Sequence, residues 1–434
     1  MSEVDLSPLE AIERAVQERA KDLALAMSEP HGAAQLRTLI AEEIERWSQE
    51  HRRGLRPFDL SQPAAVAERA FRNLAGYGPL QPLLEDDDVW EIMVNAPDSV
   101  FVRRHSGPSG YHDEVFHDDD HVVRTLTKLL DDAAGAHRKL DATEGLQDAQ
   151  LDDGARLHIV HRDVSRGGHL MVNIRKFTGI PFRHLGELVE RGMLSEQVAR
   201  FLRAAVRSGL TTVVAGPPGS GKTTLMSCCT AELDPTRRVV VAEEVFEADV
   251  PVPNVASMQT RAARADRAAV DLRRLVSGFL RMAPDVAVVG EVRDQEAMPL
   301  LLTLSSGVQG FTTIHAGSAR QALTRLRFIC QLSEAGSHLS LSALNTLVSD
   351  SVDVVVHCRR TPAGPRVTEV ISVEDLAGSP DAAQLTVTQV FERGGPDEPL
   401  RWSGSIPVRA ARSLADAGYD VRDLLGTEPA GVAW

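Results

Sequence analysis

The first 75 residues combine charged positions with apolar positions at the spacing of α-helices. Ser7-Pro8-Leu9-Glu10 joins an N-cap serine, a proline at the first helical position and a glutamate three residues after the cap, which predicts a helix start. Apolar side chains follow at helical spacing, and two more helices are predicted, one across Leu36 to Trp47 and one after Pro63. Residues 1–75 are therefore expected to form a charged helical leader that packs or docks against partners.

From residue 76 onward, short strand-like runs replace this pattern. Polar turn residues such as Pro97-Asp98 separate the runs. The predicted elements are strands over 90–95, 100–103, 157–160 and 169–174 and a helix over 121–130. These elements indicate a compact α+β domain over residues 76–177, and Gly179-Ile180-Pro181 then has the composition of a linker.

After a predicted helix over 195–207, the chain repeats a pattern of apolar strand, polar tip and helix. The predicted strands are 211–215, 238–242, 286–289, 311–314 and 354–357. This repetition is typical of a mostly parallel sheet covered by helices, with functional residues at the carboxyl ends of the strands. The α/β domain is expected over residues 178–375. A C-terminal extension, 376–434, should hold a strand near 385–391 and a helix near 408–417.

Length, charge and composition limit the classes of protein to which the chain can belong. A chain of 434 residues predicts about two or three domains. The formal net charge of -14 argues against a strongly cationic surface, so nucleic acid is not expected as a partner. The four cysteines show no CxxC spacing, which predicts free thiols. The N-terminus is acidic and no apolar stretch approaches the roughly 18 residues that cross a bilayer, so a cytoplasmic protein is expected.

One segment matches the phosphate-binding pattern GxxxxGK[ST] in full, between a predicted strand and a predicted helix. Its glycines let backbone N–H groups surround phosphate oxygens, and the helix N-terminus adds a favourable dipole. Lys222 is expected to reach the β and γ phosphates, and Thr223 to ligate Mg²⁺. The predicted ATP-binding residues are Gly216, Pro217, Pro218, Gly219, Ser220, Gly221, Lys222, Thr223 and Thr224.

Two strand ends supply the carboxylates that a nucleotide triphosphate site needs to hold magnesium and orient water. Glu243 and Glu244 follow one strand, and Glu291 follows another. The position of Glu243 and Glu291 at buried strand ends favours a functional role, whereas Glu247 fits a solvated face equally well. His315 ends a further strand and is either structural or a phosphate sensor.

Four blocks of the sequence, in this order, resemble the ATPases of type II and type IV secretion systems, and most closely the CpaF-like ATPases of Tad/Flp pili. GPPGSGKTT (216–224) resembles the Walker A motif, VVVAEEVFE (239–247) the Asp box, VGEVRD (289–294) the atypical Walker B motif and GVQGFTTIHAGS (307–318) the His box. Upstream, the segments YGPLQPLLEDDDVWEIMVN (77–95), DDGARLHIV (152–160) and VNIRKF (172–177) resemble the domain that precedes the motor in these proteins.

This resemblance implies a RecA-like P-loop motor domain that hydrolyses ATP with Mg²⁺. A homo-hexamer docked at the inner face of the membrane, on platform proteins of a pilus or secretion machine, is implied as well. By resemblance, Glu243 activates water and His315 senses the γ-phosphate. Glu291 is implied to act in catalysis and also, with Thr223 and Glu244, to bind magnesium. Arg156 and Arg175 are implied to reach the phosphates, although salt bridges on their own sheet are an alternative.

Three positions depart from the family pattern. Glu244 stands where the family usually has aspartate, Val308 replaces the first histidine of the His box, and Gln150 replaces an arginine. Val308 and Glu244 keep open the alternative of a nucleotide-gated scaffold with little turnover. A DNA-translocating ATPase of conjugation is a further alternative.

Overall fold

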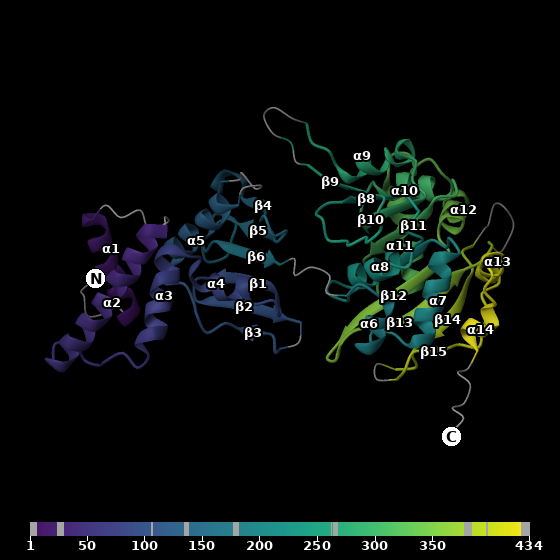
Figure 1. Cartoon of the computed structure of the whole chain (residues 1–434). Helices are drawn as coiled ribbons and strands as arrows, with labels where there is room; N and C mark the ends of the chain where they lie inside the picture. Colours follow the sequence, from purple (N-terminus) through teal and green to yellow (C-terminus); the bar gives the residue numbers. More distant parts are fainter. Residues whose placement is uncertain are drawn as a thin grey trace, which may run out of the picture. The chain divides into compact units, whose positions relative to one another are not determined.

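The computed structural model describes residues 7–23, 30–105, 107–133, 139–176, 182–261, 263, 268–376, 384–395 and 398–426. The chain forms two compact units, Met1–Thr178 and Gly179–Trp434 (Figure 1). Phe177, where the α+β domain was expected to end, and the expected linker Gly179-Ile180-Pro181 lie outside the described residues. None of the helices in the described ranges is both long and apolar enough to span a membrane.

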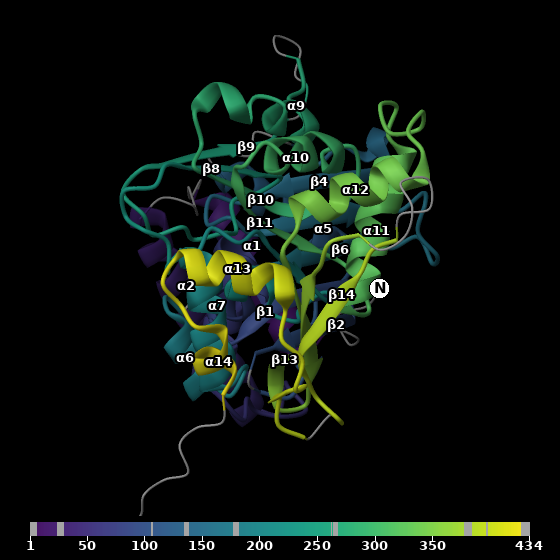
Figure 2. The same cartoon turned by 90° about the vertical axis from the view of Figure 1, so that its right-hand side faces the viewer.

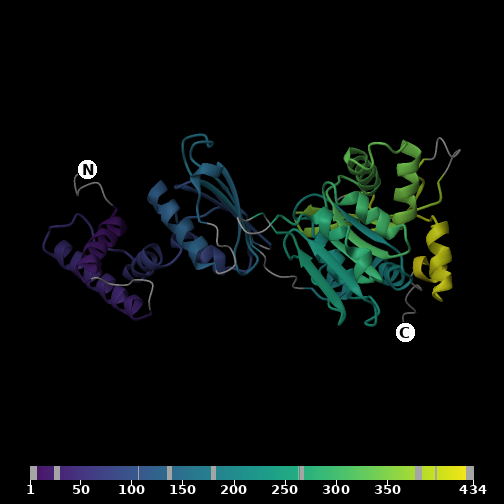
Figure 3. The ribbon, with the colours of Figure 1, turned by 90° about the horizontal axis from the view of Figure 1, so that it is seen from above.

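Unit 1 begins with three helices that pack side by side (Figure 3): α1 (Pro8–Asp22), α2 (Pro30–Arg52) and α3 (Pro63–Ala75). The predicted start of α1 is confirmed, because Ser7 Oγ accepts from the N–H of Glu10 while the Glu10 carboxylate accepts from the N–H of Ser7. The apolar stripes meet in a small separate core built around residues such as Val16, Leu36 and Ile40. Tertiary burial therefore holds the three helices together.

The rest of unit 1 is a six-stranded antiparallel sheet in the order β3-β2-β1-β6-β5-β4. Its strands are β1 (Val89–Ala96), β2 (Ser99–Arg104), β3 (Gly110–Tyr111), β4 (Leu146–Gln150), β5 (Arg156–Val160) and β6 (Met171–Arg175), and its helices are α4 (Gln81–Glu85) and α5 (Asp119–Asp132). Val122, Leu126 and Leu130 of α5 pack against the alternate inward residues of the strands. The α+β architecture expected from the sequence is present, with β3 and β4 as additional strands.

The segment from residue 114 to residue 117 connects helices α1 and α3 to the rest of unit 1. The guanidinium of Arg72 donates to both carboxylate oxygens of Glu114, at 2.7 and 2.8 Å. Glu13 on α1 is buried; its Oε2 lies 2.8 Å from Nε2 of His117, and its Oε1 accepts from Asn73 at 2.7 Å. A buried carboxylate with two such partners avoids the penalty of an unpaired charge. The helical leader is thus an integral part of unit 1.

His117 and its neighbour His121 on α5, whose Nδ1 accepts from the N–H of His117, should make the stability of unit 1 depend on pH in opposite directions. Burial, with the nearby charges of His117 and Arg124, lowers the pKa of His121 from 6.5 to about 3, so its neutral form favours folding and stability falls as pH drops from 6.5 towards 3. At His117 burial lowers the pKa, but Glu13 and Glu10 outweigh it and raise the pKa above 6.5. The stability that protonated His117 contributes is complete below pH 6.5 and is lost as pH rises through its raised pKa. Stability is therefore expected to be highest near pH 6.5.

Hydrogen exchange in α1 and α5 of the full chain, corrected for intrinsic rates, measures this dependence. Opening free energies should fall by about 1 kcal/mol per pH unit on the acid side. His121→Gln removes the titrating ring and should flatten that side. An equally steep acid limb in the variant would contradict this account.

Unit 2 is built on a nine-stranded sheet in the order β15-β14-β13-β12-β7-β11-β10-β8-β9. Its strands are β7 (Thr212–Ala215), β8 (Val239–Glu243), β9 (Val255–Gln259), β10 (Val286–Val292), β11 (Gln309–Ile314), β12 (Val354–Thr361), β13 (Gly364–Val373), β14 (Val387–Glu392) and β15 (Arg401–Trp402). β12, β7, β11, β10, β8 and β9 run parallel, and β13 to β15 continue the sheet antiparallel. β11 lies between β7, which leads into the phosphate loop, and β10. This order confirms the expected RecA-like fold class.

Helices cover both faces of the sheet (Figure 2). They are α6 (Leu185–Glu190), α7 (Glu196–Arg207), α8 (Lys222–Thr230), α9 (Leu272–Val276), α10 (Ala297–Leu304), α11 (Ala319–Leu332), α12 (Leu341–Ser351), α13 (Val408–Asp416) and α14 (Val421–Leu425). Val239 and Val241 belong to the core under α6 to α8, α13 and α14, whereas Val240 and Ala242 belong to the core under α9 to α12. Burial on both faces explains why the strands are continuous apolar runs.

Strand ends differ slightly from the sequence prediction. β8 includes Glu243 as its last residue, and β10 extends to Val292, so Glu291 lies within the strand rather than after it. The extension follows from pairing, because β10 keeps a contact with β11 at Val292 after a register shift. The pairing of the strands therefore sets the positions of Glu243 and Glu291.

Candidate functional site

The phosphate loop connects β7 to α8 in unit 2. Gly216 has a φ of 152°, and a Cβ there would collide with the carbonyl oxygen of Cys358. Gly221 has a φ of 83° and caps α8 in the left-handed conformation. Only glycine adopts both conformations easily. Ser220 Oγ donates to the carbonyl of Pro217 at 2.8 Å, so the loop is held in shape by its own residues.

Lys222 begins α8 and is only 7% exposed. Its Nζ donates to the carbonyl of Pro217 at 3.1 Å and lies 3.3 Å from Nδ1 of His315. Thr223 and Thr224 follow in the first turn and are half-buried. The lysine cation and the N-terminal N–H groups of α8 therefore lie at the same end of one helix, as an anion site requires.

A chain of polar contacts links this lysine to the acidic residues of the neighbouring strands. Nε2 of His315 lies 2.8 Å from Oε1 of Glu291. A ring protonated on Nε2 donates to Glu291 and accepts from Lys222 through Nδ1. Arg293 donates to Oε2 of Glu291 and to Oε2 of Glu244, both at 2.8 Å. Residues predicted from four separate sequence blocks thus meet at the carboxyl ends of β8, β10 and β11.

These partners keep Glu291 ionised. Burial alone would raise its pKa, but the hydrogen bonds and charges of His315 and Arg293 lower the pKa to about 2. In return, the hydrogen bond to Glu291 raises the pKa of Arg293. A permanently charged carboxylate at this place suits the outer shell of a hard cation.

Glu243 is 3% exposed and has a different environment. Its Oε1 accepts from the backbone N–H groups of Glu247 and Ala248, at 3.1 and 2.9 Å, and so fixes the turn after β8. Gly290 lies against it: a Cβ at Gly290 would be 2.9 Å from Cγ and 3.0 Å from Oε1 of Glu243. The glycine of the VGEVRD block therefore makes room for Glu243. Glu247 itself is half-buried, and its backbone N–H is one of the two donors to Glu243.

Gly290→Ala should push Glu243 out of place without touching the phosphate loop. If Glu243 works on the attacking water, turnover should fall by about ten- to a hundredfold, because small misplacements of a catalytic group are costly. Nucleotide affinity should stay within about threefold. Gly186→Ala is the control, since a Cβ at Gly186 meets nothing within 4 Å. Unchanged turnover in the Gly290 variant would argue that Glu243 is structural.

The site has the chemistry for Mg²⁺ bound together with a nucleotide. Within the described ranges, no group of three or more His, Cys, Asp or Glu side chains is placed to hold a metal alone. Magnesium commonly keeps several waters and takes phosphate oxygens with only one or two protein ligands. The oxygens of Thr223 and Glu291, with Glu244 beyond Arg293, fit that pattern.

Arg293 is a site residue that sequence reasoning did not assign. The signal in the sequence was limited to proximity, because Arg293 follows Glu291 by two residues and comes directly after the end of β10. Its contact with Glu244, however, depends on the pairing of β8 with β10, which local sequence does not reveal.

Arg156 and Arg175 belong to unit 1. They are direct partners on the neighbouring strands β5 and β6, and Glu91 of β1 is the partner of Arg175 on its other side. Gln150, one of the departures from the family pattern, lies opposite Arg156 on β4. Val308, another departure, packs against the core beneath α9 to α12.

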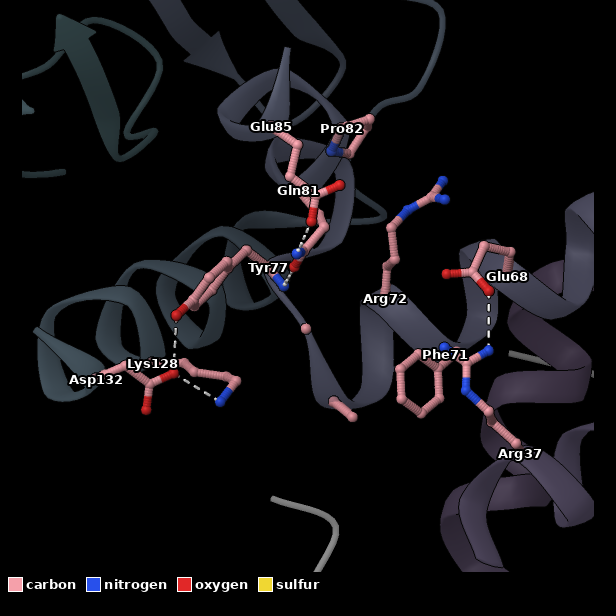
Figure 4. Close-up of a pocket in the computed structure, with 12 residues that line it drawn as sticks. Arg37, Glu68, Phe71, Arg72, Tyr77, Gln81, Pro82, Glu85, Lys128 and Asp132 are labelled. Atoms are coloured by element: carbon pink, nitrogen blue, oxygen red, sulfur yellow. Dashed lines mark hydrogen bonds and ion pairs between the residues drawn. The ribbon is translucent and has the colours of Figure 1, made fainter. Parts of the chain in front are cut away.

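A separate cavity of about 420 Å³ lies in unit 1, between the first half of α2, the second half of α3, α4 and the C-terminal end of α5 (Figure 4). Its walls carry the ion pairs Arg37–Glu68 and Lys128–Asp132, and Tyr77 donates to Asp132. Burial and the bond to Asp132 raise the pKa of Tyr77 to about 12. These side chains satisfy one another, and none of the predicted site residues lines the cavity.

The fold and the site define a class of protein: a RecA-like P-loop nucleotide-binding protein with acidic residues and a histidine at adjacent strand ends. Residues 73–384 match the family described as type II/IV secretion system protein. The chain belongs to this family, as the sequence motifs indicated. Most of the three-helix leader precedes the matched region. The closer assignment to CpaF-like members stays a prediction.

Two relatives agree with this assignment by sequence. A Mycobacterium tuberculosis protein named for conjugal transfer is 32% identical over 346 residues, covering 78% of this chain and 95% of the relative. The type IV secretion system protein PtlH of Bordetella pertussis is 32% identical, covering 65% of this chain and 88% of PtlH. The solved structure of the VirB11 ATPase from the Brucella suis type IV secretion system is 28% identical, with a TM-score of 0.36 and coverage of 67% and 94%.

Proposed function

We propose that this chain is an ATP hydrolase that powers a secretion or pilus-assembly machine. The observation that carries the proposal is the unbroken series of contacts from Lys222 through His315 and Glu291 to Arg293 and Glu244, at the strand ends of a type II/IV secretion family member. Lys222 and the N–H groups of the phosphate loop would bind the phosphates of ATP.

Each further residue has a role that its surroundings support. Glu243 would orient and deprotonate the attacking water, since it is a buried carboxylate beside Gly290. His315, between Lys222 and Glu291, would exchange the lysine contact for the γ-phosphate. Mg²⁺, when bound, would neutralise charge that develops on the phosphates. Thr223, Glu291 and Glu244 would hold its coordination shell in place.

Arg156 and Arg175 are proposed to contact the phosphates. Like charges directly opposite each other on paired strands are destabilising, so an anion near both would be favourable. Arg175→Ala should slow turnover by about tenfold or more. Arg103→Ala is the matched control, because Arg103 is an exposed arginine that pairs with Glu91 on the same sheet. Equal turnover in the two variants would favour a purely structural role for Arg175.

We further propose that the active form is a homo-hexamer docked at the cytoplasmic face of the inner membrane, on platform proteins of the machine. Heterologous contacts that close produce rings. The sequence motifs favour a Tad/Flp pilus as the machine. Light scattering with Mg²⁺ and a non-hydrolysable ATP analogue should give a mass of about six chains. A strictly monomeric mass at micromolar concentration would count against a ring motor.

Two other functions each have an observation in their favour. Val308 and the pairing of Glu244 with Arg293 favour a nucleotide-gated scaffold with little turnover. The names of relatives in conjugal transfer suggest a DNA-translocating ATPase. Stimulation of phosphate release by DNA, falling steeply with salt, would support the second alternative. The acidic net charge of -14 favours the absence of such stimulation.

A further inference from the structure

Arg293 forms hydrogen bonds with both carboxylates that are expected to support magnesium. It donates to Oε2 of Glu291 and to Oε2 of Glu244, while His315 lies against the other oxygen of Glu291. Oε2 of Glu291 is thus hydrogen-bonded to Arg293, and Oε1 has Nε2 of His315 as a close neighbour at 2.8 Å. A cation entering this place has to displace at least one of these partners.

The surroundings of Arg293 permit that displacement. Its backbone N–H and the N–H of Asp294 both donate to Oε1 of Glu296, which is 5% exposed, so the main chain is held firmly. The side chain of Arg293, by contrast, is 43% exposed. An ion pair with this exposure is weak enough to exchange for a divalent cation.

The contact of Arg293 with Glu244 and Glu291 also affects the electrostatics of nucleotide binding. Glu244 and Glu291 would repel the phosphates of an entering nucleotide if no cation lay between them. Glu247 adds a further negative charge near Arg293. Arg293 therefore screens the negative charge of Glu291 and Glu244.

We propose that Arg293 is a positioning residue that takes the place of the metal cation. It holds Glu291 and Glu244 together until Mg²⁺ binds, and its side chain is then displaced. This inference rests on the proposed function, because it requires that the site bind ATP. It implies that Arg293 sets how strongly nucleotide binding depends on magnesium. Free nucleotide benefits from the arginine, whereas the magnesium complex competes with it.

The test compares the dissociation constant of a fluorescent ATP analogue in Mg²⁺ and in EDTA, using the full chain. Arg293→Ala should weaken binding in EDTA and leave binding in Mg²⁺ equal or tighter. The ratio of the dissociation constant in EDTA to that in Mg²⁺ should rise by about five- to tenfold. Arg293→Lys keeps the charge and should restore much of the wild-type ratio. Arg237→Ala, which removes an arginine 4.0 Å from Asp285 at comparable exposure, is the control.

A second readout needs no nucleotide. Mg²⁺ alone should raise the melting temperature of Arg293→Ala, whose carboxylates are free, more than that of the wild type. Arg293→Gln replaces Arg293→Ala if circular dichroism shows that the alanine variant does not fold.

Three outcomes are decisive. A ratio within about twofold of the wild type would overturn the inference, since the inference requires Arg293 to hold Glu291 and Glu244 only until magnesium binds. Loss of binding in both buffers would also overturn it, because Arg293 would then contact the nucleotide itself. Failure of the wild type to bind in either buffer would instead refute the proposed function.

Discussion

Lys222→Ala should abolish tight nucleotide binding. Lys222 is buried at the start of α8, and its contacts in the structure are with a loop carbonyl and His315, partners that it can exchange for phosphate oxygens. Each charge-assisted hydrogen bond is worth about 1.5–3 kcal/mol, so losing two should weaken affinity by at least about 100-fold. Calorimetric titration with ATP and Mg²⁺ measures the change.

Lys128→Ala is the matched control for this experiment. Lys128 forms a surface ion pair with Asp132 in unit 1, so its removal leaves the phosphate loop intact. The control should bind ATP as the wild type does. Equal affinity in the Lys222 variant would mean that the phosphate site has been misplaced.

Glu243→Gln should separate binding from hydrolysis. Glutamine keeps the size of the side chain, and its carbonyl oxygen can still accept the backbone N–H groups of Glu247 and Ala248. The turn after β8 is therefore expected to survive, with ATP affinity unchanged. Without a carboxylate to take the proton of water, turnover should fall on the order of 10²-fold.

Single-turnover phosphate release and equilibrium binding on the same preparation distinguish these effects. If turnover stays near normal, the role of base moves to Glu244 or Glu291. If affinity falls together with turnover, Glu243 acts mainly by shaping the loop after β8.

Sequence alone was sufficient where local chemistry decides the structure. The capping box at Ser7 fixed the start of α1, and the phosphate loop was recognisable because its glycines are required one by one. The buried parallel strands were found because both of their faces are apolar. Glu243, Glu291 and His315 then followed as the polar residues at the ends of those strands.

Elements that depend on distant partners were missed. β9 (Val255–Gln259) is an edge strand with mixed polarity, and β13 (Gly364–Val373) carries polar residues along its first half. Neither stands out from sequence, because pairing with β8 and β12 stabilises them. The contacts of Arg293 with Glu244 and of His117 with Glu13 join residues 49 and 104 positions apart, which no local pattern predicts.

Steady-state phosphate release by the purified full chain, with ATP and Mg²⁺, tests the central claim most directly. A motor should release phosphate continuously, and the release should disappear in both Lys222→Ala and Glu243→Gln while the Lys128→Ala control retains it. Tight binding of ATP by the wild type with no phosphate release above the level of Lys222→Ala, whether the chain is monomeric or assembled, would contradict hydrolysis and leave the nucleotide-gated scaffold.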